Sequence, residues 1–356
     1  MYVGNDKYTV VARNNQLQLT VAKGDGYTGG DLTGSVAVSD MIVTGKITGA
    51  SVDISGTSAV QSGISSPNST ALTLNIADNS DATIEGGIVG KGSDTISVGD
   101  NAQVTITGGI QTTGGNDSIV IGTNSNVEIT GEVKATNGDD SIVIGDGSTV
   151  EIKGTDRIYL GNGQNSTVVG KNASLIVGGL LEGSGTLEIG KGGTVQTKGC
   201  ESIIFVTMDV DSVLNNTSAI QSGIKVDVVG VSDLVLNDAA DADIAGVKAV
   251  YHGCSSIQDN AKLKVDGVDM VLGSAKQIQG ADTTETTDDV WASLNRVGND
   301  LVVAWGRSEA EVGVALTAFG DGTSLVLGES FTATATTLSD SNPDNDFQKK
   351  SQGTLA

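Results

Sequence analysis

The chain has 356 residues, a formal net charge of −23, 50 glycines, two prolines and only 3% aromatic residues. This acidic excess argues against nucleic acid as a partner and against adsorption to anionic lipid, because both surfaces are themselves negative. No uninterrupted apolar run reaches the length of about 18 residues that a membrane-spanning helix needs, so no membrane span is expected.

The first 26 residues contain two short apolar stretches, Lys7–Ala12 and Leu17–Ala22, on either side of a polar turn. We expect an N-terminal cap or hairpin here, since the first coil of a repetitive fold has open strand edges. From residue 27 onward, short runs rich in Val, Ile and Thr alternate with Gly, Asn and Asp. This pattern predicts a solenoid over residues 27–280.

One phrase recurs within this region, between Gly92 and Leu160. Its copies are Gly92-Ser-Asp-Thr-Ile96, Gly115-Asn-Asp-Ser-Ile119, Gly138-Asp-Asp-Ser-Ile142 and Gly154-Thr-Asp-Arg-Ile158. The aspartates of the first three copies follow one another at a constant step of 23 residues. Self-similarity at a fixed period of this size indicates stacked repeats that bury a shared core.

A unit of this length accommodates three short strands and three corners, which is too little for a strand and a helix. Ser118–Ile121 and Asn126–Thr130 show the period-two alternation of half-buried strands. The sequence therefore predicts an all-β fold: a parallel β-helix with three strands per coil. About 250 residues would give about 11 coils, each rising about 4.8 Å.

Stacking would place Asp94, Asp117 and Asp140 in a file. Neighbouring carboxylates about 5 Å apart repel by about 3 kcal/mol at an effective dielectric constant of 20, so something must offset the repulsion. A calcium ion between coils would do so, because Ca²⁺ prefers carboxylate and carbonyl oxygens. The alternative is that each aspartate accepts hydrogen bonds from backbone N–H groups of the turn.

The phrase resembles the second half of the nonapeptide of secreted RTX proteins, Gly-Gly-x-Gly-x-Asp-x-U-x, and Gly90–Ile96 matches it best. In that family the nonapeptides follow one another without a gap and form a calcium-binding β-roll. In this chain only one partial motif occurs per 23 residues. The resemblance implies calcium as cofactor, and extracellular or cell-surface location reached by type I secretion through an uncleaved C-terminal signal. The N-terminus lacks the pattern of a cleaved signal peptide. The candidate metal-site residues are Gly92, Asp94, Gly115, Asp117, Gly138, Asp140 and Asp156, together with Asp139, the acid beside Asp140.

Groups suited to catalysis are few. The only histidine, His252, is expected to be a turn residue rather than a general base, and Cys200 and Cys254 to be structural or bridged rather than catalytic. Adjacent acids such as Asp139 and Asp140 could in principle serve a sugar lyase or glycosidase. Such an enzyme needs a groove rich in aromatic and basic groups, which this composition does not favour, so we expect no enzyme.

Beyond the solenoid, residues 281–289 form a polar acidic segment that reads as a linker. Residues 290–330 are expected to be a C-terminal β region, with a hairpin whose strands meet at Gly298–Asp300 and a second strand pair that begins at Val312–Phe319. Residues 331–356 are polar and are expected to dock on a neighbouring subunit.

The function that these features favour is structural. A rod that adds strands to the next subunit would assemble end to end into a filament, sheet, surface layer or extracellular matrix, and calcium could control that assembly. One alternative is an adhesin or passenger module that binds glycan or a host surface. The other is a polysaccharide lyase or epimerase built on a β-helix.

Overall fold

The computed structural model describes residues 2–5, 8–13, 16–21, 31–216, 225–236, 245–252, 262–279 and 289–320. By internal contacts the chain divides into two units, Met1–Phe205 with Asn215–Gln221, and Val206–Leu214 with Ser222–Ala356. Residues 281–288 of the expected linker, the tail at 331–356 and Cys254 lie outside the described residues. Among the described residues, no helix has both the length and the apolar character needed to cross a bilayer.

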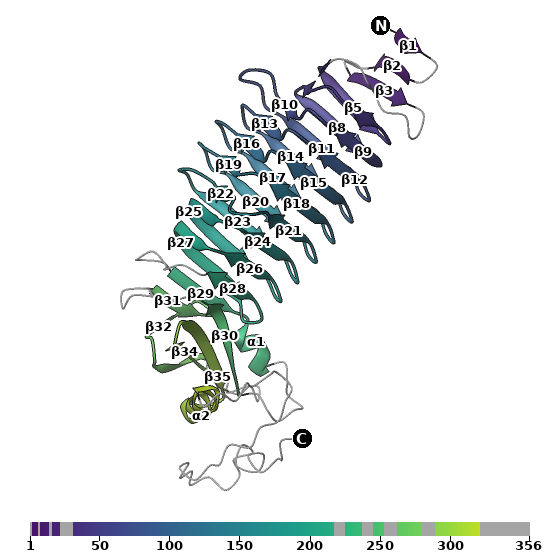
Figure 1. Cartoon of the computed structure of the whole chain (residues 1–356). Helices are drawn as coiled ribbons and strands as arrows, with labels where there is room; N and C mark the ends of the chain where they lie inside the picture. The colour runs from purple at the N-terminus through teal and green to yellow at the C-terminus, as the bar shows by residue number, and fades with distance from the viewer. Residues whose placement is uncertain are drawn as a thin grey trace. The chain divides into compact units, whose positions relative to one another are not determined.

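The first unit is a parallel β-solenoid, as the repeat predicts, with about 8 turns (Figure 1). Three files of strands run along it. The first file consists of β4 (Leu32–Thr33), β7 (Ile47–Thr48), β10 (Ile64–Ser65), β13 (Ile88–Gly90), β16 (Ile110–Thr112), β19 (Val133–Ala135) and β22 (Ile158–Tyr159). The second consists of β5 (Ser35–Ser39), β8 (Ser51–Ser55), β11 (Thr73–Ile76), β14 (Thr95–Val98), β17 (Ser118–Ile121), β20 (Ser141–Ile144) and β23 (Asn165–Val169).

The third file consists of β6 (Ile42–Val43), β9 (Thr57–Val60), β12 (Asp81–Ile84), β15 (Gln103–Thr107), β18 (Asn126–Thr130), β21 (Thr149–Ile152), β24 (Ser174–Val177) and β26 (Thr194–Thr197). The long strand β25 (Leu180–Ile189) continues both other files, because it pairs with β22 at one end and with β23 at the other. Before the first coil, β1 (Tyr2–Asn5), β2 (Tyr8–Arg13) and β3 (Gln16–Val21) pair antiparallel, and β3 continues parallel to β5.

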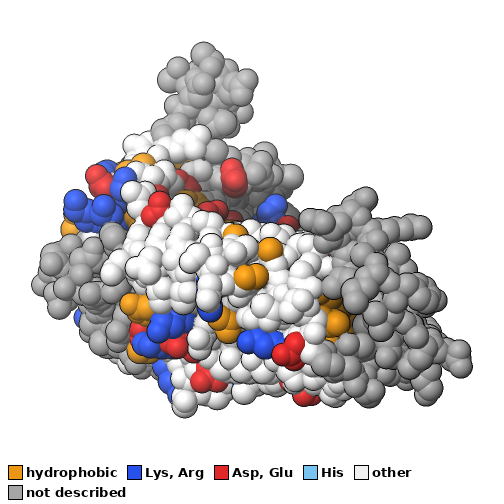
Figure 2. Space-filling model, turned by 90° about the horizontal axis from the view of Figure 1, so that it is seen from above, with side chains coloured by type: hydrophobic (Ala, Val, Ile, Leu, Met, Phe, Trp, Pro, Cys, Tyr) orange, Lys and Arg blue, Asp and Glu red, His pale blue; other side chains and the backbone are white. Residues whose placement is uncertain are grey.

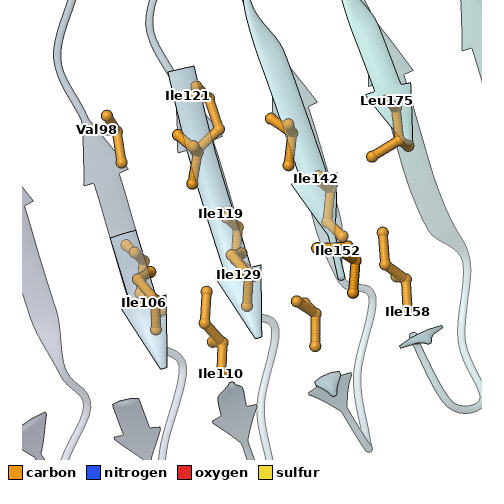
Figure 3. A pocket seen from close by; sticks show the side chains of 14 residues that line it. Val98, Ile106, Ile110, Ile119, Ile121, Ile129, Ile142, Ile152, Ile158 and Leu175 are labelled. Carbon is orange, nitrogen blue, oxygen red and sulfur yellow. The ribbon is translucent and has the colours of Figure 1, made fainter. Parts of the chain in front are cut away.

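Inward and outward side chains alternate along each strand, and the inward ones form the core. In β17, Ile119 and Ile121 are buried while Ser118 and Val120 face outward. Each fully buried aliphatic side chain contributes about 2 kcal/mol to stability. Figure 3 shows these side chains converging from all three files into the interior of the coils; those labelled are Val98, Ile106, Ile110, Ile119, Ile121, Ile129, Ile142, Ile152, Ile158 and Leu175.

Asparagines make the corner between the second and third files. Asn101 and Asn124 have φ values of 55° and 53°, a left-handed conformation that Asn tolerates better than most residues. The coils therefore turn at the Asn and Gly positions that punctuate the sequence.

The second unit is mainly antiparallel. β27 (Gly199–Asp209) and β28 (Val213–Asn216) contribute residues to both units. The rest comprises β29 (Lys225–Val229), α1 (Val231–Leu236), β30 (Gly246–His252), β31 (Lys262–Val265), β32 (Val268–Met270), β33 (Ala275–Gln279), β34 (Val290–Val297), β35 (Asp300–Gly306) and α2 (Glu309–Gly320). The strands β33, β34, β35 and β30 form an antiparallel sheet in that order, and β34–β35 is the hairpin expected around Gly298–Asp300. Since this pairing takes over from residue 246, the parallel stack has fewer turns than the 11 expected.

The expectation of a strand at Val312–Phe319 is wrong, because these residues lie in α2. The helix starts with Ser308-Glu-Ala-Glu311, the sequence of a capping box. The Ser308 hydroxyl accepts a hydrogen bond from the Glu311 N–H at 3.2 Å, and the Glu311 carboxylate accepts one from the Arg307 N–H at 2.6 Å. Val312 and Ala315 then pack against Val302 in the core of this unit.

Candidate functional site: a buried file of aspartates

Asp94, Asp117 and Asp140 stand at one corner of successive coils, each directly before a strand of the second file. Their exposed fractions are 1%, 3% and 2%, so all three side chains point inward. Strand pairing fixes the stack, because Ser118 lies opposite both Thr95 and Ser141 in register. The stacking that the repeat predicts for these three residues is confirmed.

A chain of hydrogen bonds joins the corner from coil to coil. Asp94 Oδ1 accepts from the Leu72 N–H at 2.7 Å, Asp117 Oδ1 from the Asp94 N–H at 2.8 Å, and Asp140 Oδ1 from the Asp117 N–H at 2.9 Å. Asn165 ends the series, since its Oδ1 accepts from the Asp140 N–H at 2.8 Å. We call Asp94, Asp117, Asp140 and Asn165 the corner ladder.

Asn165 is suited to the last position of the corner ladder. Its Nδ2 donates to the Leu160 carbonyl at 2.7 Å, a bond that a carboxylate could not make. Both polar atoms of this amide therefore have a partner, which is what burial at 2% exposure requires. The corner ladder therefore ends in an amide at the coil where a backbone carbonyl, that of Leu160, can accept the extra hydrogen bond.

The remaining carboxylate oxygens are less well satisfied. Within the described part of the chain, Asp117 Oδ2 and Asp140 Oδ2 are buried and have no hydrogen-bond partner. Burial is the main cause that raises the pKa of Asp94 and Asp117, and it raises the pKa of Asp140 to about 6, with the Asp117 and Asp139 charges adding to the effect. The N–H bonds act in the opposite direction. These carboxyls consequently hold protons more firmly than exposed aspartates do.

The fourth phrase does not belong to this file. Ile158 pairs with Val133 in the first file of strands, whereas Ile142 belongs to the second file. Asp156 is therefore at a different corner, where its Oδ2 accepts from the Gly131 N–H at 2.7 Å. The coil that follows Asp140 is 25 residues long rather than 23, and Asn165 takes the fourth place in the file.

The other expected metal-site residues have steric or outward roles. Asp139 is exposed and accepts from the Gln164 N–H at 2.8 Å, so it points away from its neighbour Asp140 and the two acids do not converge. A Cβ on Gly92 would lie 2.7 Å from the backbone nitrogen of Ala71, and one on Gly138 would lie 2.0 Å from the carbonyl oxygen of Gly115. Gly115 and Gly138 also have positive φ values of 91° and 115°.

No group of three or more His, Cys, Asp or Glu side chains in the described ranges could hold a metal ion. In the corner ladder the bonds run between a carboxylate of one coil and a backbone N–H of the preceding coil. Of the two means of offsetting repulsion between these acids, the structure provides backbone hydrogen bonds, which come from the neighbouring coil rather than from the turn itself. Calcium binding at these residues stays a prediction.

A second buried series runs parallel to the corner ladder and has no counterpart in the sequence-based expectations. The Ser125 hydroxyl accepts from the Ala102 N–H at 3.0 Å and donates to the Gly99 carbonyl at 2.7 Å. Ser148 repeats both contacts one coil later, with the Ser125 N–H and the Gly122 carbonyl. The step of 23 residues between the two serines is the signal available in the sequence.

The two residues considered for other chemistry lie elsewhere. His252, expected in a turn, is the last residue of β30, and its Nδ1 is 3.1 Å from Asp300 Oδ1 on the paired strand β35. Cys200 is buried and free, and burial raises the pKa of its thiol to about 12. A thiol of that kind is unreactive as a nucleophile.

These features define a repeat protein of the parallel β-solenoid class, with buried polar ladders at its corners. Comparisons with protein-family models, with curated proteins and with solved structures found no match.

Proposed function

We propose that this chain is a structural, non-catalytic subunit that joins further copies of itself end to end by strand addition. The observation that carries the proposal is the N-terminal end of the solenoid. In the described residues β4 pairs only with β7, and β6 only with β9, so two parallel strands have an open side there. Open strand edges are templates for pairing with another chain.

The hydrogen bonds show which backbone groups are available. The Met41 and Val43 carbonyls accept from the Ala59 and Gln61 N–H groups, both at 2.8 Å, so these residues face β9. Alternate residues of a parallel strand point their backbone groups to opposite sides, and the N–H and C=O of Ile42 therefore point to the open side. The Ile42 side chain is also 42% exposed, which places an apolar group on the same edge.

Strand addition at this end would be heterologous, because one end of a subunit would meet a different surface of the next. Contacts of this type do not close into a ring unless the rotation allows it, and they otherwise produce fibres. Assembly at a cell surface or in an extracellular matrix is the setting we propose, with an adhesin module and a polysaccharide-acting β-helix as the alternatives. A monomer that binds glycan would favour the first alternative over assembly.

Replacement of Ile42 by proline tests this function. Proline has no N–H, and at residue 42 the missing donor is the one that points outward, so the bonds between β6 and β9 remain. We expect Ile42→Pro to reduce polymer formation at least tenfold, measured by sedimentation and electron microscopy of the full chain. The matched control Ile42→Val keeps the N–H and should polymerise like the wild type. Wild-type protein that stays monomeric over a wide concentration range, with calcium and with a chelator, would refute the proposal.

A further inference from the structure

The sequence contains two Asn-Gly pairs, Asn137-Gly138 and Asn162-Gly163, and both lie in the solenoid. In such a pair the backbone nitrogen of the glycine can attack the amide carbon of the asparagine side chain, because glycine has no Cβ to hinder the approach. The reaction needs no enzyme and is one reason why asparagine is a thermolabile residue. Each pair is therefore a candidate site of spontaneous modification.

Other asparagines at the corners of the solenoid are protected by the residue that follows them. After Asn101, the Ala102 N–H donates to the Ser125 hydroxyl at 3.0 Å. After Asn124, the Ser125 N–H donates to the Ser148 hydroxyl at 2.9 Å. In both cases the nitrogen that would attack is held in a hydrogen bond and its residue carries a Cβ. The buried serine series thus also protects the asparagines beside it.

Asn137 lacks this protection. It is exposed at the corner between β19 and β20, and in the described ranges no hydrogen bond of the Gly138 N–H is found. The backbone of Gly163 does have a partner. The Asn137 Nδ2 donates to the adjacent Thr136 hydroxyl at 3.3 Å, which is long for a hydrogen bond and holds the side chain only weakly. Of the two pairs, Asn137-Gly138 is consequently the one open to attack.

We propose that Asn137 is a site of spontaneous deamidation and isoaspartate formation. The Gly138 nitrogen forms a bond to Asn137 Cγ, the Cγ–Nδ2 bond breaks, and ammonia leaves with the proton of the Gly138 N–H. Water then opens the resulting succinimide ring at one of its two carbonyl carbons. Opening at Cγ gives aspartate, and opening at the main-chain carbonyl gives isoaspartate, in which the backbone continues through Cγ. The only other reactant is water.

Isoaspartate adds one atom to the backbone between residue 137 and Gly138. The coil has no room for it here, since even a Cβ on Gly138 would lie 2.0 Å from the carbonyl oxygen of Gly115 in the preceding coil. The added atom would displace Asp140, whose Oδ1 accepts from the Asp117 N–H in the corner ladder. The modification therefore opens the ladder in the middle of the solenoid.

Both products also place a carboxylate where a neutral amide stood. On the side that Figure 2 presents, uncharged groups cover most of the described surface and acidic side chains gather in small clusters. At this corner the new charge would lie close to Asp139, which is itself exposed, so repulsion adds to the mismatch in backbone length. The inference is independent of end-to-end assembly, and in a structural protein the modification would limit the lifetime of the stack.

Peptide mapping by mass spectrometry tests the site in the full chain, incubated in the folded state under mildly alkaline conditions. We expect Asn137 to be modified at least tenfold faster than Asn101 and Asn124. The variant Asn137→Gln keeps an amide but forms the larger ring less readily, so its residue 137 should stay intact. In urea, Asn162 should react as fast as Asn137, because both precede glycine. Equal rates at Asn137, Asn101 and Asn124 in the folded chain would overturn the proposal.

The protective role of the hydrogen bonds has its own test. Ser148→Ala removes the acceptor of the Ser125 N–H and should raise the rate at Asn124 several-fold. Ser141→Ala is the matched control, since Ser141 is an outward serine of β20 and should leave that rate unchanged. An unchanged rate at Asn124 in Ser148→Ala would show that the hydrogen bond is not what protects it.

Hydrogen exchange then reports the effect on the corner ladder. The Asp117 amide should exchange rapidly in the isoaspartate-containing fraction of the incubated wild type, and slowly in Asn137→Gln incubated in the same way. Slow exchange of this amide in molecules that contain isoaspartate would overturn the opening of the ladder.

Discussion

Replacement of Gly138 by alanine is expected to lower the free energy of unfolding by more than about 3 kcal/mol. Two costs combine. The φ of 115° is one that residues with a Cβ rarely adopt, and the new Cβ would lie 2.0 Å from the Gly115 carbonyl oxygen in the preceding coil. Backbone atoms of a stacked coil cannot move aside without breaking the strand pairing next to them.

The measurement is urea unfolding followed by circular dichroism, once with calcium and once with a chelator. Gly154→Ala is the matched control, since Gly154 has a φ of 68° but no atom within 4 Å of the added Cβ. We expect Gly154→Ala to cost about 1 kcal/mol. Equal losses for the two variants would show that the close approach between coils is not what requires glycine at residue 138.

Acidification is expected to stabilise the solenoid through Asp140. Its pKa is about 6 in the folded chain against an ordinary value of 3.8, so the folded state binds the proton more tightly than the unfolded state does. The free energy of unfolding should therefore rise by about 1.4 kcal/mol as pH falls from about 7.5 to about 5, out of a full gain of about 3 kcal/mol for a shift of about two pKa units. The gain is complete only below the unfolded pKa, and it is lost as pH rises through 6.

Asp140→Asn isolates this effect, because an amide keeps the acceptor for the Asp117 N–H and removes the titration. We expect the variant to show a smaller change in stability between pH 5 and pH 7.5 than the wild type, by about 1.4 kcal/mol. Asp146→Asn is the control at an exposed corner of the same coil, where the carboxylate accepts from the Lys171 N–H at 2.8 Å. It should retain the pH dependence of the wild type. An unchanged pH dependence in Asp140→Asn would contradict the role of this carboxyl.

The regular part of the fold can be predicted from the sequence, because a step of 23 residues and period-two alternation leave few other arrangements. The spacing also identifies Asp94, Asp117 and Asp140 as one file. It cannot show which partner offsets their charges, since calcium and a backbone N–H both satisfy a carboxylate. That distinction depends on which way each side chain points, and the structure turns all three inward.

The place of the fourth phrase and the wrong expectation at Val312–Phe319 both have definite causes. The fourth phrase, which ends at Ile158, matches the others in its letters, but its Asp156 does not keep the step of 23 residues after Asp140 and precedes a strand of the first file. The match of Asn165-Ser-Thr-Val168 to Asp140-Ser-Ile-Val143 is the better guide to the file. In α2, the apolar run from Val312 suggests a strand, but the capping box that begins at Ser308 is the stronger local signal.

Hydrogen exchange at the Asp117 amide tests the stacked ladder most directly, because this N–H donates to a side chain 23 residues away, in the next coil. The account predicts that the wild-type amide exchanges only through large-scale opening, and that Asp140→Ala accelerates its exchange at least a hundredfold more than that of the Ser118 amide, which bonds to the Asp94 carbonyl. Rapid exchange of the Asp117 amide in the wild type would contradict the stacking of coils on which every other inference depends.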